Sequence, residues 1–233
     1  MTRCTTLIAD YWSGPRRVRY LGLQPSSPPS PPPRGTATVA LARPGVPSLV
    51  TIGGGIVFYT LIVQLSYVLN AAGVSDPAAI GGITAVMSLA TAIGAGLFTK
   101  VASRGPRVLL IAEFATSGLG LLLIFAAGSV PPIVAGAVLT GAATGLLLPT
   151  LLTWAVNRLP FAQRGRGTGL WTGALFLGEF VSPLLVAALT AVTGGLAASL
   201  AVLGLASLIM AALVGTVLAV PTSSLNAPTA EQP

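Results

Sequence analysis

The sequence predicts an all-α polytopic membrane protein with six transmembrane helices. Hydrophobic residues make up 53% of the 233 residues and charged residues only 7%, whereas soluble domains carry about 25% charged residues. Mean hydropathy is +0.87. No charged residue occurs from Phe180 to Ala230. As a helix, that stretch is long enough to cross a bilayer core of about 30 Å twice.

Six apolar segments follow one another along the chain, each close to the roughly 20 residues that a membrane helix needs. Helices are expected because an irregular backbone facing lipid would leave its donors and acceptors without partners. Transmembrane strands would instead show alternating segments of about ten residues, which this sequence lacks. The predicted spans are 48–70, 78–99, 108–128, 131–154, 167–190 and 196–219.

The basic residues between these spans all fall on one side of the six-span arrangement. The connections on the other side carry one charged residue, Asp76. The positive-inside rule predicts that the basic side faces the cytoplasm, so we expect both termini in the cytoplasm of a protein of the inner or plasma membrane of the cell. The basic residues between the spans are Lys100, Arg104, Arg107, Arg158, Arg164 and Arg166.

Charge and rare residue types argue against several functions. The formal charge is +7, but no stretch combines dense basic residues with aromatic residues, so we expect no nucleic acid partner. The chain has no histidine and a single cysteine, Cys4, which argues against a disulfide framework, a protein zinc site and His-dependent catalysis. We therefore expect no catalytic residues, no metal and no cofactor.

Two carboxylates lie inside predicted spans, where ionisable groups are costly and usually functional. Glu179 lies roughly 20 Å along the helix from Arg166, near the bilayer midplane. We expect it to face an aqueous or protein-lined cavity; the alternative is a structural carboxylate bonded to a neighbouring helix. Glu113 lies closer to the cytoplasmic interface, where we expect an ion pair. Its expected partners are Lys100, Arg104 and Arg107.

The first span carries several polar side chains. Thr60, Gln64, Tyr67 and Ala71 follow the spacing of one helix face. Gln64 lies near mid-span, where an amide without a partner is costly. A stripe that faces substrate and a set of interhelical hydrogen bonds explain this pattern equally well. The candidates for lining a substrate cavity are Glu179, Gln64, Tyr67, Asn70 and Tyr59.

Small residues and two prolines lie within the spans. The segment "GAVLTGAATG" places Gly136, Thr140 and Thr144 on one face, and small residues at this spacing let helices approach closely in lipid. Packing alone is the simpler interpretation; the alternative is that such contacts permit the rocking that transporters need. Pro149 and Pro183 are expected to bend their helices, as static kinks or as hinges.

Two loops carry a family resemblance. "FAQRGRGTGLWTGALFLGEFVSPLL" joins spans four and five, and "FTKVASRGPRVLL" joins spans two and three. With six spans, these loops resemble the C-terminal six-helix half of a major facilitator superfamily transporter, over about residues 45–220. The second loop resembles the family's Gly-x-x-x-Asp-Arg-x-Gly-Arg motif without its acid. The resemblance implies small-molecule transport through a midplane cavity. Its candidate loop and gating residues are Arg104, Arg107, Lys100, Arg164, Arg166 and Glu113.

The N-terminal region repeats part of the loop between spans four and five. "RVRYLGLQ" at 17–24 matches "RGRGTGLW" at 164–171 in register. Because the family's two halves are related by duplication, residues 1–24 resemble the end of helix 4 and the 4–5 loop of a missing first half. Residues 25–47 are rich in Pro and Ser and predict a disordered linker, either a central loop or the trace of a deletion or frameshift. The six-helix domain then covers 48–220, with a disordered cytoplasmic tail at 221–233.

Two hypotheses about function follow. The first is a secondary transporter that imports or exports a small molecule, with the lipid bilayer and a second half, or a second copy of the chain, as partners. The second is an inactive transporter fragment, or a protein that acts only by binding another membrane protein. A membrane enzyme is least favoured, because a Ser or Thr nucleophile would have no His to activate it.

Overall fold

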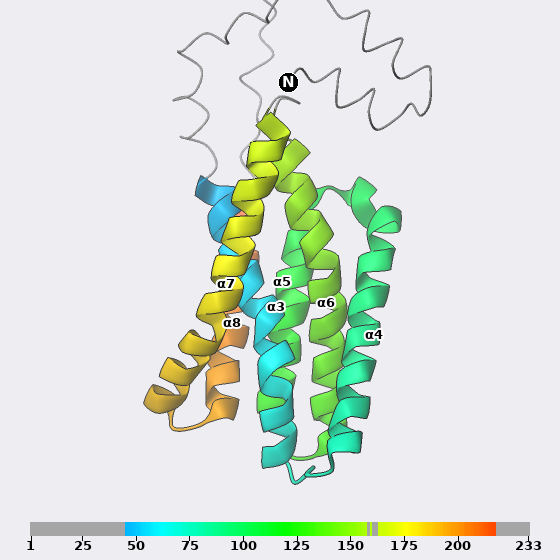
Figure 1. The fold of residues 1–233 in the computed structure, drawn as a ribbon, viewed down its shortest axis with the longest axis vertical. Helices are drawn as coiled ribbons and strands as arrows, with labels where there is room; N and C mark the ends of the chain where they lie inside the picture. The colour runs from blue at the N-terminus through cyan, green and yellow to red at the C-terminus, as the bar shows by residue number, and fades with distance from the viewer. Residues whose placement is uncertain (1–44, 158, 160–162, 218–233) are drawn as a thin grey trace, which may run out of the picture. The chain divides into compact units, whose positions relative to one another are not determined.

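Six long helices make up the part of the chain that the computed structural model describes, residues 45–157, 159 and 163–217 (Figure 1). All six are long and apolar enough to cross a membrane, which confirms the predicted all-α polytopic class. The proposed remnant at 1–24, the predicted linker up to residue 44, Arg158 and the tail at 221–233 lie outside the described residues. Residues 45–47, predicted as the end of that disordered linker, are instead the start of a helix. The helices are α3 (Gly45–Ala71), α4 (Pro77–Val101), α5 (Pro106–Phe125), α6 (Val130–Asn157), α7 (Arg164–Thr193) and α8 (Leu196–Val217).

The helix boundaries agree closely with the predicted spans, because turn-forming residues mark them. The side chain of Asp76 accepts hydrogen bonds from the backbone of Ala78 and Ala79, both at 3.2 Å, and so caps α4. Gly105 has a φ of 81° just before α5, and Gly194 has a φ of 78° just after α7. Glycine adopts this left-handed region without steric cost.

α7, α3, α6 and α4 form a row in that order, with α5 and α8 behind it (Figure 1). α3 packs against α7 on one side and α6 on the other, and α4 packs against the far side of α6. α5 packs behind α6 and against α8, which also contacts α7 and α3. We call the side of the row away from α5 and α8 the open face. The end helices α4 and α7 are the least buried. Of the most apolar stretch of each helix, 17% is buried in α4 and 22% in α7, against 56% in α6.

Glycine residues hold the crossing helices in contact. A Cβ atom built on Gly118 would lie 2.7 Å from the carbonyl oxygen of Gly204, whereas an ordinary contact needs about 3.4 Å. Small residues therefore allow the close packing that stabilises helix pairs in lipid, as predicted for Gly136. The pairs with glycine on both helices are Gly55 with Gly178 (α3–α7), Gly120 with Gly136 (α5–α6) and Gly118 with Gly204 (α5–α8).

Candidate functional site

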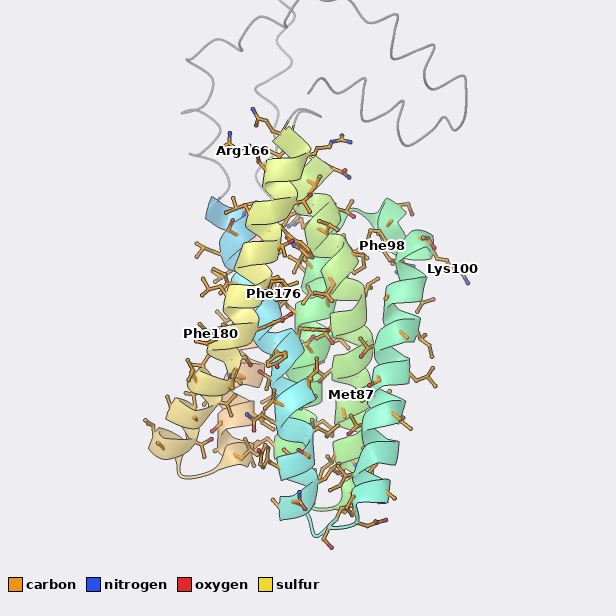
Figure 2. All side chains as sticks on the ribbon, in the orientation of Figure 1. Met87, Phe98, Lys100, Arg166, Phe176 and Phe180 are labelled. Atoms are coloured by element: carbon orange, nitrogen blue, oxygen red, sulfur yellow. The ribbon has the colours of Figure 1, made fainter. Side chains whose placement is uncertain are left out.

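A small pocket lies where α3, α4 and α6 meet, with a volume of about 130 Å³. Met87, labelled in Figure 2, forms part of its wall between α4 and α6. All of the lining residues lie near the middle of their helices, so the pocket is near the centre of the membrane. The lining residues are Phe58, Leu61 and Ile62 of α3, Met87, Ser88 and Thr91 of α4, and Thr140, Gly141 and Thr144 of α6.

Every hydroxyl group that lines this pocket donates to a backbone carbonyl oxygen: Thr140 to that of Ser117 in α5 at 3.4 Å, and the other three within their own helices. Ser88 donates to the carbonyl oxygen of Thr84 at 2.9 Å, Thr91 to that of Met87 at 3.0 Å, and Thr144 to that of Thr140 at 2.8 Å. A hydroxyl has one hydrogen to donate and two lone pairs that accept. Since each hydrogen is already donated to a backbone carbonyl oxygen, these groups can serve a ligand only as acceptors.

Glu179 lies on α7, next to the point where α7 crosses α3. A Cβ atom built on Gly55 would lie 3.3 Å from the backbone nitrogen of Glu179. Gly55, Phe58 and Ile62 follow the i, i+3, i+7 spacing of one face of α3, so Glu179 lies beside the same face that lines the pocket. Its side chain is half-buried, and its carboxylate makes no hydrogen bond to any other residue that the structure describes.

The predicted polar stripe of α3 faces in a different direction from the pocket. Thr60 is buried, and its hydroxyl oxygen lies 3.0 Å from that of Ser182, which donates to the carbonyl oxygen of Ile56 at 3.0 Å. This part of the stripe therefore contacts α7. Tyr67 is 61% exposed, and Asn70 donates to the backbone of its own helix.

None of the predicted cavity residues, Glu179, Gln64, Tyr67, Asn70 and Tyr59, lines the pocket. Tyr59 comes closest, because it follows Gly55 by one helical turn. Six lining residues were not predicted from the sequence: Phe58, Leu61, Ile62, Met87, Ser88 and Thr91. The only signal for the last two was their i, i+3 spacing in one span, and Ser and Thr are common in membrane helices for packing reasons alone.

Glu113 is buried between α5 and α6, with 2% of its surface exposed. Thr150 of α6 donates to its Oε1 at 2.7 Å, while Oε2 has no partner within the described part of the chain. The expected ion pair with Lys100, Arg104 or Arg107 is therefore wrong. The physical reason is direction: Glu113 faces α6 inside the bundle, whereas these three side chains are exposed at its end.

The basic side chains gather at one end of the bundle, because α4 ends where α5 and α7 begin. Lys100 and Arg166, labelled in Figure 2, lie toward this end, as do Arg104 and Arg164. Arg107 has a structural partner: its guanidinium donates twice to the carbonyl oxygen of Gly215, at 3.1 and 2.8 Å. A cation at the C-terminus of α8 is favourable, since carbonyl groups there lack helical partners.

Residues 47–233 match the sequence model of the Major Facilitator Superfamily. The chain belongs to this superfamily. No curated protein matches it in sequence. Members of the superfamily are transporters rather than enzymes. Membership and the six apolar helices together indicate a multi-pass membrane transport protein. Such a protein has the lipid bilayer and a small-molecule substrate as partners. The resemblance predicted from the two loops is confirmed.

Proposed function

We propose that this superfamily member is one half of a secondary transporter, and that its substrate moves along the open face. The observation that carries the proposal is the mid-depth pocket among α3, α4 and α6, with Glu179, whose carboxylate bonds to no described residue, beside the same face of α3. Sites near the midplane, at the interface between two repeats, are typical of secondary transporters.

The cost of placing the Glu179 carboxylate in lipid indicates that water or protein covers the open face. A carboxylate at the centre of a membrane helix costs about 2.5–3.5 kcal/mol on insertion scales when lipid surrounds it. No residue in the described part of the chain offsets this cost by a hydrogen bond to Glu179. Water or a second protein surface over the open face would offset it. In this proposal Glu179 is the proton-linked group of transport.

The small volume of the pocket also suggests a second protein surface. Pockets that hold small molecules usually measure about 300–1,000 Å³, whereas this pocket measures about 130 Å³. The row of four helices thus supplies one wall of a pathway. We propose that a second copy of the chain, or a separately encoded half, supplies the other wall against α4 and α7, the two helices that are least buried.

The basic end of the bundle is proposed to face the cytoplasm, following the positive-inside rule. The exposed cations Lys100, Arg104, Arg164 and Arg166 are the candidates for contacts that gate this end. Labelling from outside the cell tests the orientation: cysteines placed beside Arg104 and Arg164 should stay unlabelled by a reagent that cannot cross the membrane. Labelling of either position would contradict the proposed sidedness.

A matched pair of cysteine variants tests whether water reaches the open face. Ile62 lines the pocket and is 47% exposed; Ile209 lies on α8, behind the row, and is 61% exposed. In a Cys4→Ser background, a charged water-soluble thiol reagent should label Ile62→Cys at least about tenfold faster than Ile209→Cys, because thiolates form in water and not in lipid. Equal rates would contradict an aqueous pathway.

Flux measurements test transport itself. The chain is reconstituted in liposomes, and uptake of a panel of labelled cationic, neutral and anionic solutes is measured with and without a pH gradient. We expect uptake of at least one solute, and loss of its dependence on the gradient in Glu179→Gln. No uptake of any solute would favour the second hypothesis, a chain that acts only by binding another membrane protein. So would a strictly monomeric chain on crosslinking in native membranes.

A further inference from the structure

We propose that the ligand of the open face is a lipophilic organic cation, such as a quaternary ammonium or phosphonium ion. The inference rests on the proposed transport function and names the chemical class of the substrate. Three properties of the described residues carry it: the hydrogen-bonding character of the pocket, the sign of the charge beside it, and the apolar and aromatic groups that surround both.

The hydroxyl groups of the pocket select against ligands that must accept hydrogen bonds. Ser88, Thr91 and Thr144 donate to backbone carbonyl oxygens of their own helices, so they present lone pairs to the pocket. A carboxylate or phosphate ligand would meet oxygen atoms there and would receive no hydrogen bond. A cation meets the same oxygen atoms favourably, since their dipoles point their negative ends at it.

The charged group described at mid-depth beside the open face is negative. Glu179 is the only carboxylate described at mid-depth beside the open face, because Glu113 is buried against α6 and Asp76 caps the far end of α4. All Lys and Arg residues within the described ranges lie at the opposite end of α4, in the first turn of α5 or at the start of α7. An anion at mid-depth would therefore find no counter-charge, whereas a cation would neutralise Glu179.

Aromatic and aliphatic side chains complete the environment. Phe58 lines the pocket together with Ile62 and Met87. Phe176 precedes Glu179 by one turn of α7 and is 61% exposed on the surface of that helix, as Figure 2 shows. Aromatic faces attract cations, and quaternary ammonium ions are commonly bound this way. The apolar walls favour a cation whose charge is shielded by hydrocarbon over a strongly hydrated one such as a primary ammonium ion.

Equilibrium binding of labelled tetraphenylphosphonium to the detergent-solubilised full chain tests the inference. Micelles without protein serve as the blank. Binding of tetraphenylborate, an anion of nearly the same shape, is measured in a separate titration, because the two ions pair with each other when mixed. We expect saturable binding of the cation, weakened at least about tenfold in Glu179→Gln because the charge is lost, and no saturable binding of the borate. Asp76→Asn is the matched control: it removes one negative charge far from the pocket and keeps a residue that can cap α4.

A second variant keeps the test decisive if Glu179→Gln fails to fold. Phe58→Leu removes the ring and retains an apolar side chain, and it should weaken cation binding about two- to fivefold. Saturable binding of tetraphenylborate but not of the phosphonium, or affinities unchanged in both variants, would overturn the inference. Cation binding without flux in liposomes supports this inference and contradicts transport. Uptake of an anionic or neutral solute without cation binding supports transport and contradicts this inference.

Discussion

The crossing of α3 and α7 at Gly55 and Gly178 allows a quantitative test of the packing. In Gly55→Ala, the new Cβ atom would lie 2.5 Å from the carbonyl oxygen of Leu175 and 3.2 Å from the Cα atom of Gly178. Both neighbours are backbone atoms, so no side chain can rotate away. Reaching an ordinary contact of about 3.4 Å requires the two helices to separate by roughly 0.9 Å at this point.

That separation affects the next turn as well. The hydroxyl oxygens of Thr60 and Ser182, one turn beyond Gly55, are 3.0 Å apart, and a shift of the same size would take them beyond hydrogen-bonding distance. Overpacking of this kind costs about 1–3 kcal/mol, and a lost buried hydrogen bond about 1 kcal/mol. We therefore expect Gly55→Ala to lower the free energy of unfolding by about 2–4 kcal/mol.

Gly173→Ala is the control, because a Cβ atom there meets nothing within 4 Å. Alanine favours a helix over glycine by up to about 1 kcal/mol, so this variant should be as stable as the parent or more stable. Unfolding in mixed micelles with increasing denaturing detergent, followed by helical circular dichroism, measures both. If the two variants agree within about 0.5 kcal/mol, the crossing is not held by contact between glycines, and the reasoning fails.

Two further substitutions test the contacts of Glu113 and Arg107, which were first expected to act as loop and gating residues. Glu113→Met removes a buried oxygen atom, Oε2, that has no partner among the described residues, and Thr150 keeps its backbone acceptor. The melting temperature should therefore stay unchanged or rise. A fall of several degrees would show that the carboxyl group has a further partner. Arg107→Gln removes two hydrogen bonds to Gly215, so hydrogen exchange in the last turn of α8 should quicken about three- to tenfold, whereas Lys100→Gln should leave it unchanged.

The span boundaries could be predicted because the cost of placing a residue in lipid depends mostly on that residue. Asp76 and Pro77 end one apolar segment and begin the next, and Gly105 with Pro106 does the same on the other side. The largest difference is three residues. It occurs at the start of α3 and of α7 and at the end of α5, α6 and α7.

The pocket was less predictable. A membrane helix is apolar on all sides, so its periodicity does not distinguish a side that faces lipid from a side that faces protein. Ser88 and Thr91 looked like ordinary packing residues in their span, and only the meeting of α3, α4 and α6 makes them part of a pocket. Conversely, the spacing of Thr60 and Gln64 identified a real face of α3, but Thr60 on that face contacts α7.

The sequence by itself determined how many helices cross the membrane, where each begins and ends, and which end of the bundle is basic. These properties follow from local sums of hydropathy and charge. Only the tertiary structure decided which faces meet: that Gly55 contacts Gly178, that Glu113 faces Thr150 and not an arginine, and that Arg107 caps α8. The reason is that packing energy belongs to pairs of surfaces far apart in the chain, and no single span contains that information.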